Sequence, residues 1–220
     1  MTILALEFSS LQRSVAVVCG RAGAAASVVS EVIETGAGGT PAFAMIQSAL
    51  REAQLERERI EVLAVGLGPG SYTGIRVAIS MARGWQLAAG VRVLGISSAE
   101  VVAAQAQAEK IFGPVSVVID AQRNEFYSSR YEISAEERRE VEPLRILTRA
   151  EVEARSATDC AAGPDITRWF PAGRAVYPRA VVLAQLAQVR EKLSDDGNLE
   201  PIYLRQTSFV KAPPARPTVL

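Results

Sequence analysis

Short apolar runs separated by polar turns dominate the hydrophobic pattern of this chain and predict β-strands. We expect strands at residues 3–8, 14–19, 24–33, 62–67, 91–96, 115–119 and 125–133. Two longer segments, 40–55 and 75–89, carry apolar residues at helical spacing instead. Strands separated by helices predict an α/β fold of mixed sheets flanked by helices, with an antiparallel portion in each half.

The two halves of the chain share an order of elements: a strand, a turn with an acidic residue, and a second strand. Glu7 is the acidic residue in the first half, and Asp120 is its counterpart in the second. This repeat predicts two similar lobes, an N-terminal lobe over residues 1–109 and a C-terminal lobe over 110–220. The stretch from about residue 211 is rich in proline, so we expect it to be an extended, mobile tail.

Both predicted helices are apolar on two sides. In 75–89, the face expected to pack on a sheet consists of Ile75, Ala78, Ile79, Ala82, Trp85 and Ala89, and a second face carries Val77, Met81, Gly84 and Ala88. In 40–55, where Thr40 and Pro41 are the expected N-cap and first helical residue, the two faces are Phe43, Ile46, Leu50 and Ala53, and Ala44, Met45, Ser48 and Leu55. Each helix therefore needs a second partner besides its sheet, either a neighbouring helix of the same chain or another protein.

A glycine-rich run at residues 68–74 stands between a predicted strand and the helix in 75–89. Such a turn can present backbone N–H groups to phosphate, which makes Gly68, Gly70, Ser71 and Thr73 candidate phosphate-binding residues. The run does not match a Walker A loop, because Ile75 and Arg76 follow where Lys and Ser or Thr are needed. It also fails the dinucleotide fingerprint, since its third glycine is one position late. The alternative is a sharp strand-to-helix turn with Thr73 as the N-cap.

Composition excludes several classes of function. The chain has 24 basic and 24 acidic residues, so no overall positive charge attracts nucleic acid, and RNA contact would need a local patch or a partner. It has no histidine, which excludes histidine-ligated metals and nucleophiles that depend on a histidine base. Cys19 and Cys160 lack the paired spacing of a zinc site or disulfide framework, which favours a reducing compartment. The short apolar run at 3–6 has no basic segment before it, so we expect a cytoplasmic protein without a membrane span.

Carboxylates are the remaining candidates for acid-base or metal chemistry. Glu7 and Asp120 each follow a strand-like run, and ligands of α/β proteins gather beyond the carboxyl ends of strands. One hypothesis is therefore a small ATP-dependent phosphotransferase with both carboxylates around magnesium. The alternative is that each residue caps a turn.

Motifs along nearly the whole chain resemble the TsaB (YeaZ) family. They are found at residues 65–76, 95–98, 119–121, 125–127, 177–180 and 201–205. The resemblance implies a fold like that of the actin and hexokinase-like ATPases, with two related α/β lobes. It also implies a role as the dimerisation subunit of the bacterial complex that installs threonylcarbamoyl on the adenosine beside the anticodon of tRNA.

The resemblance implies a supporting role for this chain, without catalytic residues, a metal site or a required cofactor. In such complexes a paralogous TsaD subunit performs the transfer, the ATPase TsaE joins, and ATP or ADP with magnesium enters through the complex. The family pairs through its first lobe, with TsaD or with a second copy when TsaD is absent, and tRNA is reached only through the complex. The interface residues that we predict are Phe43, Ile46, Leu50, Val77, Met81, Gly84 and Ala88.

The chain departs from the family pattern at three places. Residues 7–9 read Glu-Phe-Ser where the family usually has Asp-Thr-Ser, and 41–42 read Pro-Ala where it has His-Ser. Residues 120–123 read Asp-Ala-Gln-Arg where the family more usually has Asp-Ala-Arg followed by Met or Lys. The longer acid and the lost hydroxyl of the first motif argue against ATP hydrolysis by this chain alone. An older description of relatives as metal-dependent glycoprotein peptidases conflicts with the absence of histidine.

Overall fold

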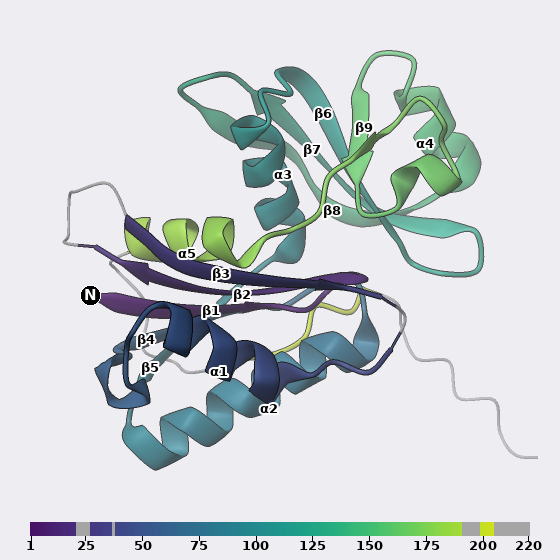
Figure 1. Ribbon diagram of the computed structural model, residues 1–220. Helices are drawn as coiled ribbons and strands as arrows, with labels where there is room; N and C mark the ends of the chain where they lie inside the picture. Colours follow the sequence, from purple (N-terminus) through teal and green to yellow (C-terminus); the bar gives the residue numbers. More distant parts are fainter. Residues whose placement is uncertain (21–26, 37, 191–198, 205–220) are drawn as a thin grey trace, which may run out of the picture.

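The computed structural model describes residues 1–20, 27–36, 38–190 and 199–204, and it contains two five-stranded sheets (Figure 1). The first sheet has the order β3-β2-β1-β4-β5. Its strands are β1 (Thr2–Glu7), β2 (Gln12–Cys19), β3 (Ser27–Thr35), β4 (Val62–Gly66) and β5 (Arg92–Ile96). The central strands β1 and β4 are buried on both faces and read as continuous apolar runs, whereas the edge strand β3 is largely exposed.

The second sheet repeats the connectivity of the first. Its order is β10-β9-β6-β7-β8, formed by β6 (Gly113–Asp120), β7 (Glu125–Ile133), β8 (Arg138–Thr148), β9 (Cys160–Gly163) and β10 (Arg174–Ala175). In both sheets the first strand pairs antiparallel with the second and parallel with the fourth. This duplicated arrangement confirms the predicted α/β fold with two similar lobes of mixed sheets flanked by helices.

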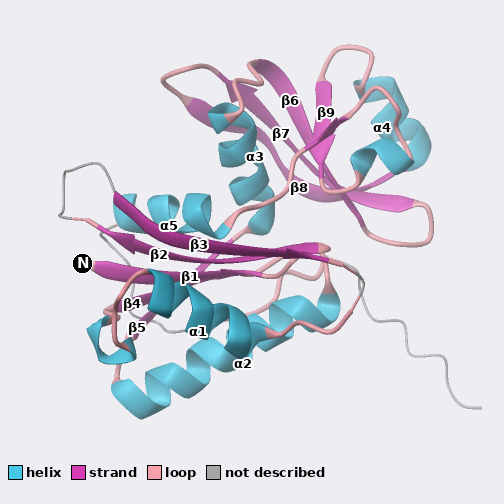
Figure 2. Ribbon diagram, in the orientation of Figure 1, coloured by secondary structure: helices cyan, strands magenta, loops and turns pink. Residues whose placement is uncertain are grey.

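Helices cover both faces of each sheet (Figure 2). On the first sheet, α1 (Ala42–Glu52) and α2 (Tyr72–Ala89) share one core with one face, and α5 (Ala180–Val189) packs on the other. On the second sheet, α3 (Ser98–Ala108) covers one face, and α4 (Arg149–Arg155) lies on the opposite side. Short 3-10 turns occupy Arg57–Arg59 and Ile166–Arg168. Within the described part of the chain, no helix has both the length and the hydropathy to span a bilayer.

The helices α3 and α5 cross between the lobes. α3 follows the first sheet but packs on the second, with Val101 and Ala104 reaching back into the core under α5. α5 follows the second sheet but packs on the first. The division predicted at residues 109 and 110 falls in the connection between α3 and β6, and as a statement about domains it stays a prediction. The predicted tail from about residue 211, and residues 24–26 of the predicted third strand, lie outside the described residues.

The motif at 177–180 forms the joint by which α5 docks on the first sheet. The backbone N–H of Ala180 donates to the Ser14 hydroxyl at 2.7 Å, and that of Val181 donates to the Glu31 carboxylate at 3.3 Å. The same carboxylate pairs with Arg179. Two residues of the first lobe thus cap the N-terminus of a helix from the second half of the chain, which satisfies N–H groups that a helix cannot pair by itself.

Candidate functional site

The glycine-rich loop between β4 and α2 packs tightly on the chain's own backbone. A Cβ atom at Gly70 would overlap the carbonyl oxygen of Ser9, and one at Gly74 would overlap the carbonyl oxygen of Phe8. The Ser71 N–H donates to the same Ser9 carbonyl at 2.7 Å. Glycine is therefore required at these two positions because other backbone atoms of the protein lie too close for a side chain. This requirement would exist whether or not the loop binds phosphate.

The N-cap of α2 is Ser71, so the prediction of Thr73 was wrong. The Ser71 hydroxyl accepts a hydrogen bond from the Gly74 N–H at 3.3 Å, and helical geometry begins at Tyr72. Gly68 donates its N–H to the Ser98 hydroxyl at 3.1 Å. Protein groups thus occupy the N–H groups of three loop residues. A phosphate-binding role for Gly68, Gly70, Ser71 and Thr73 stays a prediction.

Glu7 is completely buried at the carboxyl end of β1. Its Oε1 accepts from the Ser9 N–H at 2.9 Å, and its Oε2 accepts from the Ser98 hydroxyl at 3.0 Å. The carboxylate fills the space above Gly66, where any Cβ would overlap it. Burial raises the pKa of Glu7 above its usual value, against the opposing effect of the hydrogen bonds from Ser9 and Ser98.

The buried carboxyl group makes stability depend on pH. Because the pKa of Glu7 is higher in the folded than in the unfolded chain, its contribution is fully present below about pH 4.5 and is lost as pH rises through the folded pKa. We expect Glu7→Gln to gain free energy of unfolding relative to the natural chain as pH rises from about 5 to about 8. Urea denaturation of both proteins across this range measures the difference, and a difference independent of pH would contradict the expectation.

Asp120 occupies the equivalent position at the end of β6 but caps a turn near the surface. Its Oδ1 accepts from the Gln122 N–H at 2.7 Å. Gln122, Arg123 and Asn124 all have left-handed backbone angles, with φ of 62°, 57° and 62°. Three such residues in succession are unusual outside glycine and form a tight hairpin turn. Among the described residues, no group of three or more acidic or cysteine side chains could hold a metal ion.

The predicted interface residues differ in exposure. Phe43 is 77 % exposed, and Gly84 and Ala88 are exposed. Leu50, Val77 and Met81 are partly buried against the core of the first lobe. Ile46 is only 5 % exposed, so the expected face that combined it with Phe43 does not exist, because Met45 and Ile46 together turn toward the sheet.

The structure adds Leu87, which lies outside both of the apolar faces predicted for the helix in 75–89. Its side chain is 88 % exposed on α2, one helical turn beyond Gly84. We use the name α1–α2 surface for these exposed residues of the two helices, Phe43 near the start of α1 and Gly84, Leu87 and Ala88 near the end of α2. No atom of the described residues lies within 4 Å of a Cβ placed at Gly84, so this part of the helix has room for an approaching partner. The signal available in the sequence was a large apolar residue outside both of the apolar faces predicted for this helix.

The segment 199–204 returns to the first lobe and lies along α2. Leu199 is buried in the core, and its carbonyl accepts from Arg83 at 3.2 Å. Tyr203 stacks on Tyr72 with ring centroids 5.6 Å apart, and the Arg76 guanidinium lies 4.2 Å from the centre of the Tyr72 ring. The motif at 201–205, of which residue 205 is not described, thus adds to the exposed side of α2 near its beginning.

Comparisons with known proteins agree with this geometry. A family model described as TsaD, tRNA N6-adenosine threonylcarbamoyltransferase, matches residues 42–194. The tRNA threonylcarbamoyladenosine biosynthesis protein TsaB of Haemophilus influenzae is 30% identical, over 78% of this chain and 81% of that protein. An uncharacterized protein of Mycobacterium tuberculosis is also 30% identical, over 73% and 72%. The solved structure of YeaZ from Pseudomonas aeruginosa superposes with a TM-score of 0.76 at 26% identity and covers 92% of this chain and 99% of that one.

Proposed function

Because this chain belongs to the TsaB (YeaZ) family, we propose that it is the non-catalytic subunit that supports threonylcarbamoyl transfer to tRNA. Its named relatives are tRNA threonylcarbamoyladenosine biosynthesis proteins, which places the chain in that process. The proposed role is to bind and stabilise a TsaD-like catalytic subunit together with a TsaE-like ATPase. The observation that carries the proposal is the α1–α2 surface, whose large apolar side chains, Phe43 and Leu87, are 77% and 88% exposed.

The chemistry of the α1–α2 surface suits a helix from another protein. Phe43 and Leu87 offer large apolar side chains, and burying them in a partner would remove them from water. Gly84 and Ala88 are small and lie on the same helix, so a second helix could approach closely. The same features would allow two copies of this chain to pair when the catalytic subunit is absent.

The interior of the first lobe supports a role without independent catalysis. Both oxygens of Glu7 accept hydrogen bonds from protein groups in a fully buried position. In this setting the carboxylate is less suited to holding magnesium than a carboxylate that faces a crevice. ATP or ADP with magnesium, and tRNA, would then meet the complex through its other subunits. Turnover of magnesium-ATP by the isolated chain would favour the alternative of a small phosphotransferase.

The interface is tested by Gly84→Arg, which places a bulky charge in the α1–α2 surface. We expect the affinity for the TsaD-like subunit of the same organism to fall at least about tenfold, because an unpaired charge would be buried in the contact. Isothermal titration calorimetry with that subunit measures the change. In a reconstituted assay of tRNA threonylcarbamoylation, we expect the activity with Gly84→Arg to fall as its affinity for the TsaD-like subunit falls.

The matched control is Glu136→Arg, which introduces the same side chain in the exposed turn between β7 and β8 of the other lobe. The affinity of this variant for the TsaD-like subunit should equal that of the natural chain. Equal affinities for both variants would show that Gly84 lies outside the interface. Absence of any binding by the natural chain, with full modification activity in its absence, would remove the proposed function itself.

A further inference from the structure

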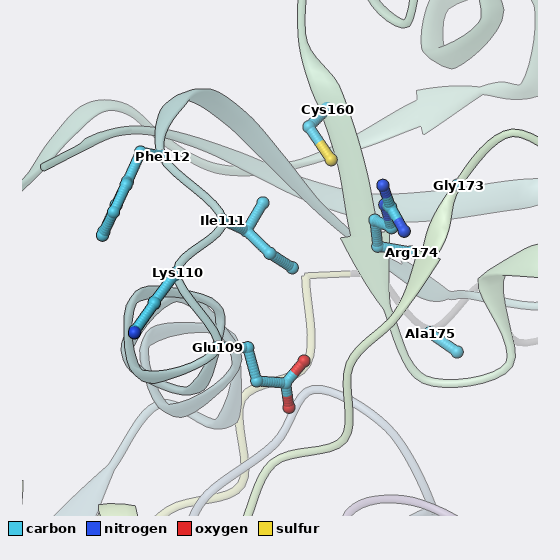
Figure 3. Close-up of a pocket in the computed structure, with 8 residues that line it drawn as sticks. All are labelled: Glu109, Lys110, Ile111, Phe112, Cys160, Gly173, Arg174 and Ala175. Atoms are coloured by element: carbon cyan, nitrogen blue, oxygen red, sulfur yellow. The ribbon is translucent and has the colours of Figure 1, made fainter.

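A pocket of about 680 Å³ opens in the second lobe, on the side of the molecule formed by the end of α3 and the edge strand β10 (Figure 3). Glu109 and Ile111 line it from the connection that follows α3, Cys160 lines it from β9, and Arg174 lines it from β10. Its volume lies within the range of about 300–1,000 Å³ that is typical of small-molecule sites. Neither the predicted phosphate loop nor the α1–α2 surface contributes to it.

The negative wall of the pocket is held in place by a buried side chain. Gln105 of α3 is only 6 % exposed, and its Nε2 donates to Glu109 Oε1 at 2.8 Å. Within the described part of the chain, no group pairs with Glu109 Oε2. In Figure 3 the carboxylate of Glu109 and the side chain of Ile111 both point toward the centre of the pocket.

The positive wall is formed by Arg174, on the opposite side of the pocket from Glu109 (Figure 3). Cys160 of β9 lines the same pocket as Arg174. Burial raises the pKa of the Cys160 thiol, and the Arg174 charge partly opposes that rise. Arg174 forms no ion pair with any described residue. Opposite charges therefore line two walls of one pocket without neutralising each other.

We propose that this pocket binds a small zwitterion of the amino-acid or short-peptide class, with its carboxylate on Arg174 and its ammonium group on Glu109. A ligand with one charge would satisfy one wall and leave the other unpaired, whereas a zwitterion satisfies both. Arginine presents a planar pair of donors that matches a carboxylate, and the free Glu109 oxygen can accept from an ammonium group. Ile111, which also lines the pocket, offers apolar surface for a side chain of the ligand.

The test is isothermal titration calorimetry of the full chain with each standard L-amino acid and with the dipeptides Gly-Leu and Leu-Gly. We expect at least one of these to bind with a dissociation constant of about 1 mM or below. Binding of free amino acids alone, or of dipeptides alone, distinguishes the two sources of the same chemistry. For a binding probe such as L-leucine, 4-methylpentanoate lacks the ammonium group and 3-methylbutylamine lacks the carboxylate, and both should bind at least about tenfold more weakly.

Two variants remove one wall each. Arg174→Gln and Glu109→Gln should each weaken binding of the zwitterion at least about tenfold, while their thermal unfolding stays unchanged because both side chains are exposed. The control is Lys110→Gln, whose side chain borders the pocket but points away from its centre in Figure 3, and it should bind normally.

The proposal is overturned if none of the zwitterions binds, or if both wall variants bind as tightly as the natural chain. It is also overturned if 4-methylpentanoate binds as tightly as L-leucine, since the pocket would then be a simple anion site. All of these measurements use the chain without partners. Their outcome is therefore independent of the Gly84→Arg result.

Discussion

Gly74→Ala is expected to lower the free energy of unfolding by about 3 kcal/mol, whereas Gly84→Ala on the same helix should raise it by up to about 1 kcal/mol. At Gly74 the added Cβ would overlap the carbonyl oxygen of Phe8, so backbone must move. At Gly84 the part of the chain that the structure describes places no atom within 4 Å of the added methyl group. Alanine there gains helix propensity without a clash.

Urea unfolding of the two variants and the natural chain measures this contrast. The pair is matched, because both positions lie in α2 and both changes add one methyl group. If Gly74→Ala unfolds at the same denaturant concentration as Gly84→Ala, the loop does not pack on the residues after β1 as described. The packing argument for glycine in this motif would then fail.

Asp159→Ala should lower the free energy of unfolding by about 1–3 kcal/mol, because it leaves the buried Ser116 hydroxyl without its acceptor. The Asp159 side chain is 2% exposed and accepts from Arg130 Nε at 2.8 Å and from the Ser116 hydroxyl at 2.8 Å. Burial alone raises the pKa of Asp159, but hydrogen bonds from Arg130, Ser116 and Thr158 bring the net pKa below its usual value. The alanine variant removes the carboxylate that joins β6, β7 and the start of β9.

The control is Glu153→Ala, which breaks the Arg149–Glu153 pair on the surface of α4 and should change the free energy of unfolding too little to resolve.

The lowered pKa of Asp159 predicts that the destabilisation of Asp159→Ala depends on pH. Its stabilising contribution is present above the unfolded pKa of about 3.8 and is lost as pH falls through the folded pKa, so acid should narrow the gap between the natural chain and Asp159→Ala. If Asp159→Ala and Glu153→Ala had equal unfolding midpoints at neutral pH, the hydrogen bonds of buried Asp159 would not stabilise the second lobe as we expect.

The hydrophobic pattern located the strands of the first lobe and the pair β6 and β7 within a few residues. It also identified the buried face of α2, where Ile75, Ala78, Ile79 and Ala82 are all in the core. These successes have a local cause, since the period of apolar residues depends only on neighbours in the sequence. The boundaries of both helices were less accurate: α2 starts after Ser71, and α1 starts at Ala42 with Pro41 at its N-cap.

The crossing helices show where the pattern failed. α5 has almost no polar stripe, so its sequence does not distinguish the sheet that it covers, and no helix was assigned to 180–189 or to 98–108. Ser14 and Glu31 decide the location of α5, and they lie far from it in the chain. The pocket between Glu109 and Arg174 could not be predicted for the same reason, since its charged residues lie far apart in the chain and only folding brings them together.

By itself the sequence determined that this protein has two similar α/β lobes, that histidine chemistry is excluded, and that its motifs are those of the TsaB family. Those conclusions rest on residue types and on spacing along the chain. Only the tertiary structure decided that the loop glycines make room for the carbonyls of Phe8 and Ser9, that the buried Glu7 side chain fills the space beside Gly66, and that Leu87 remains exposed. The physical reason is that each of these depends on which distant backbone atoms approach or leave a residue, and periodicity carries no information about such approaches.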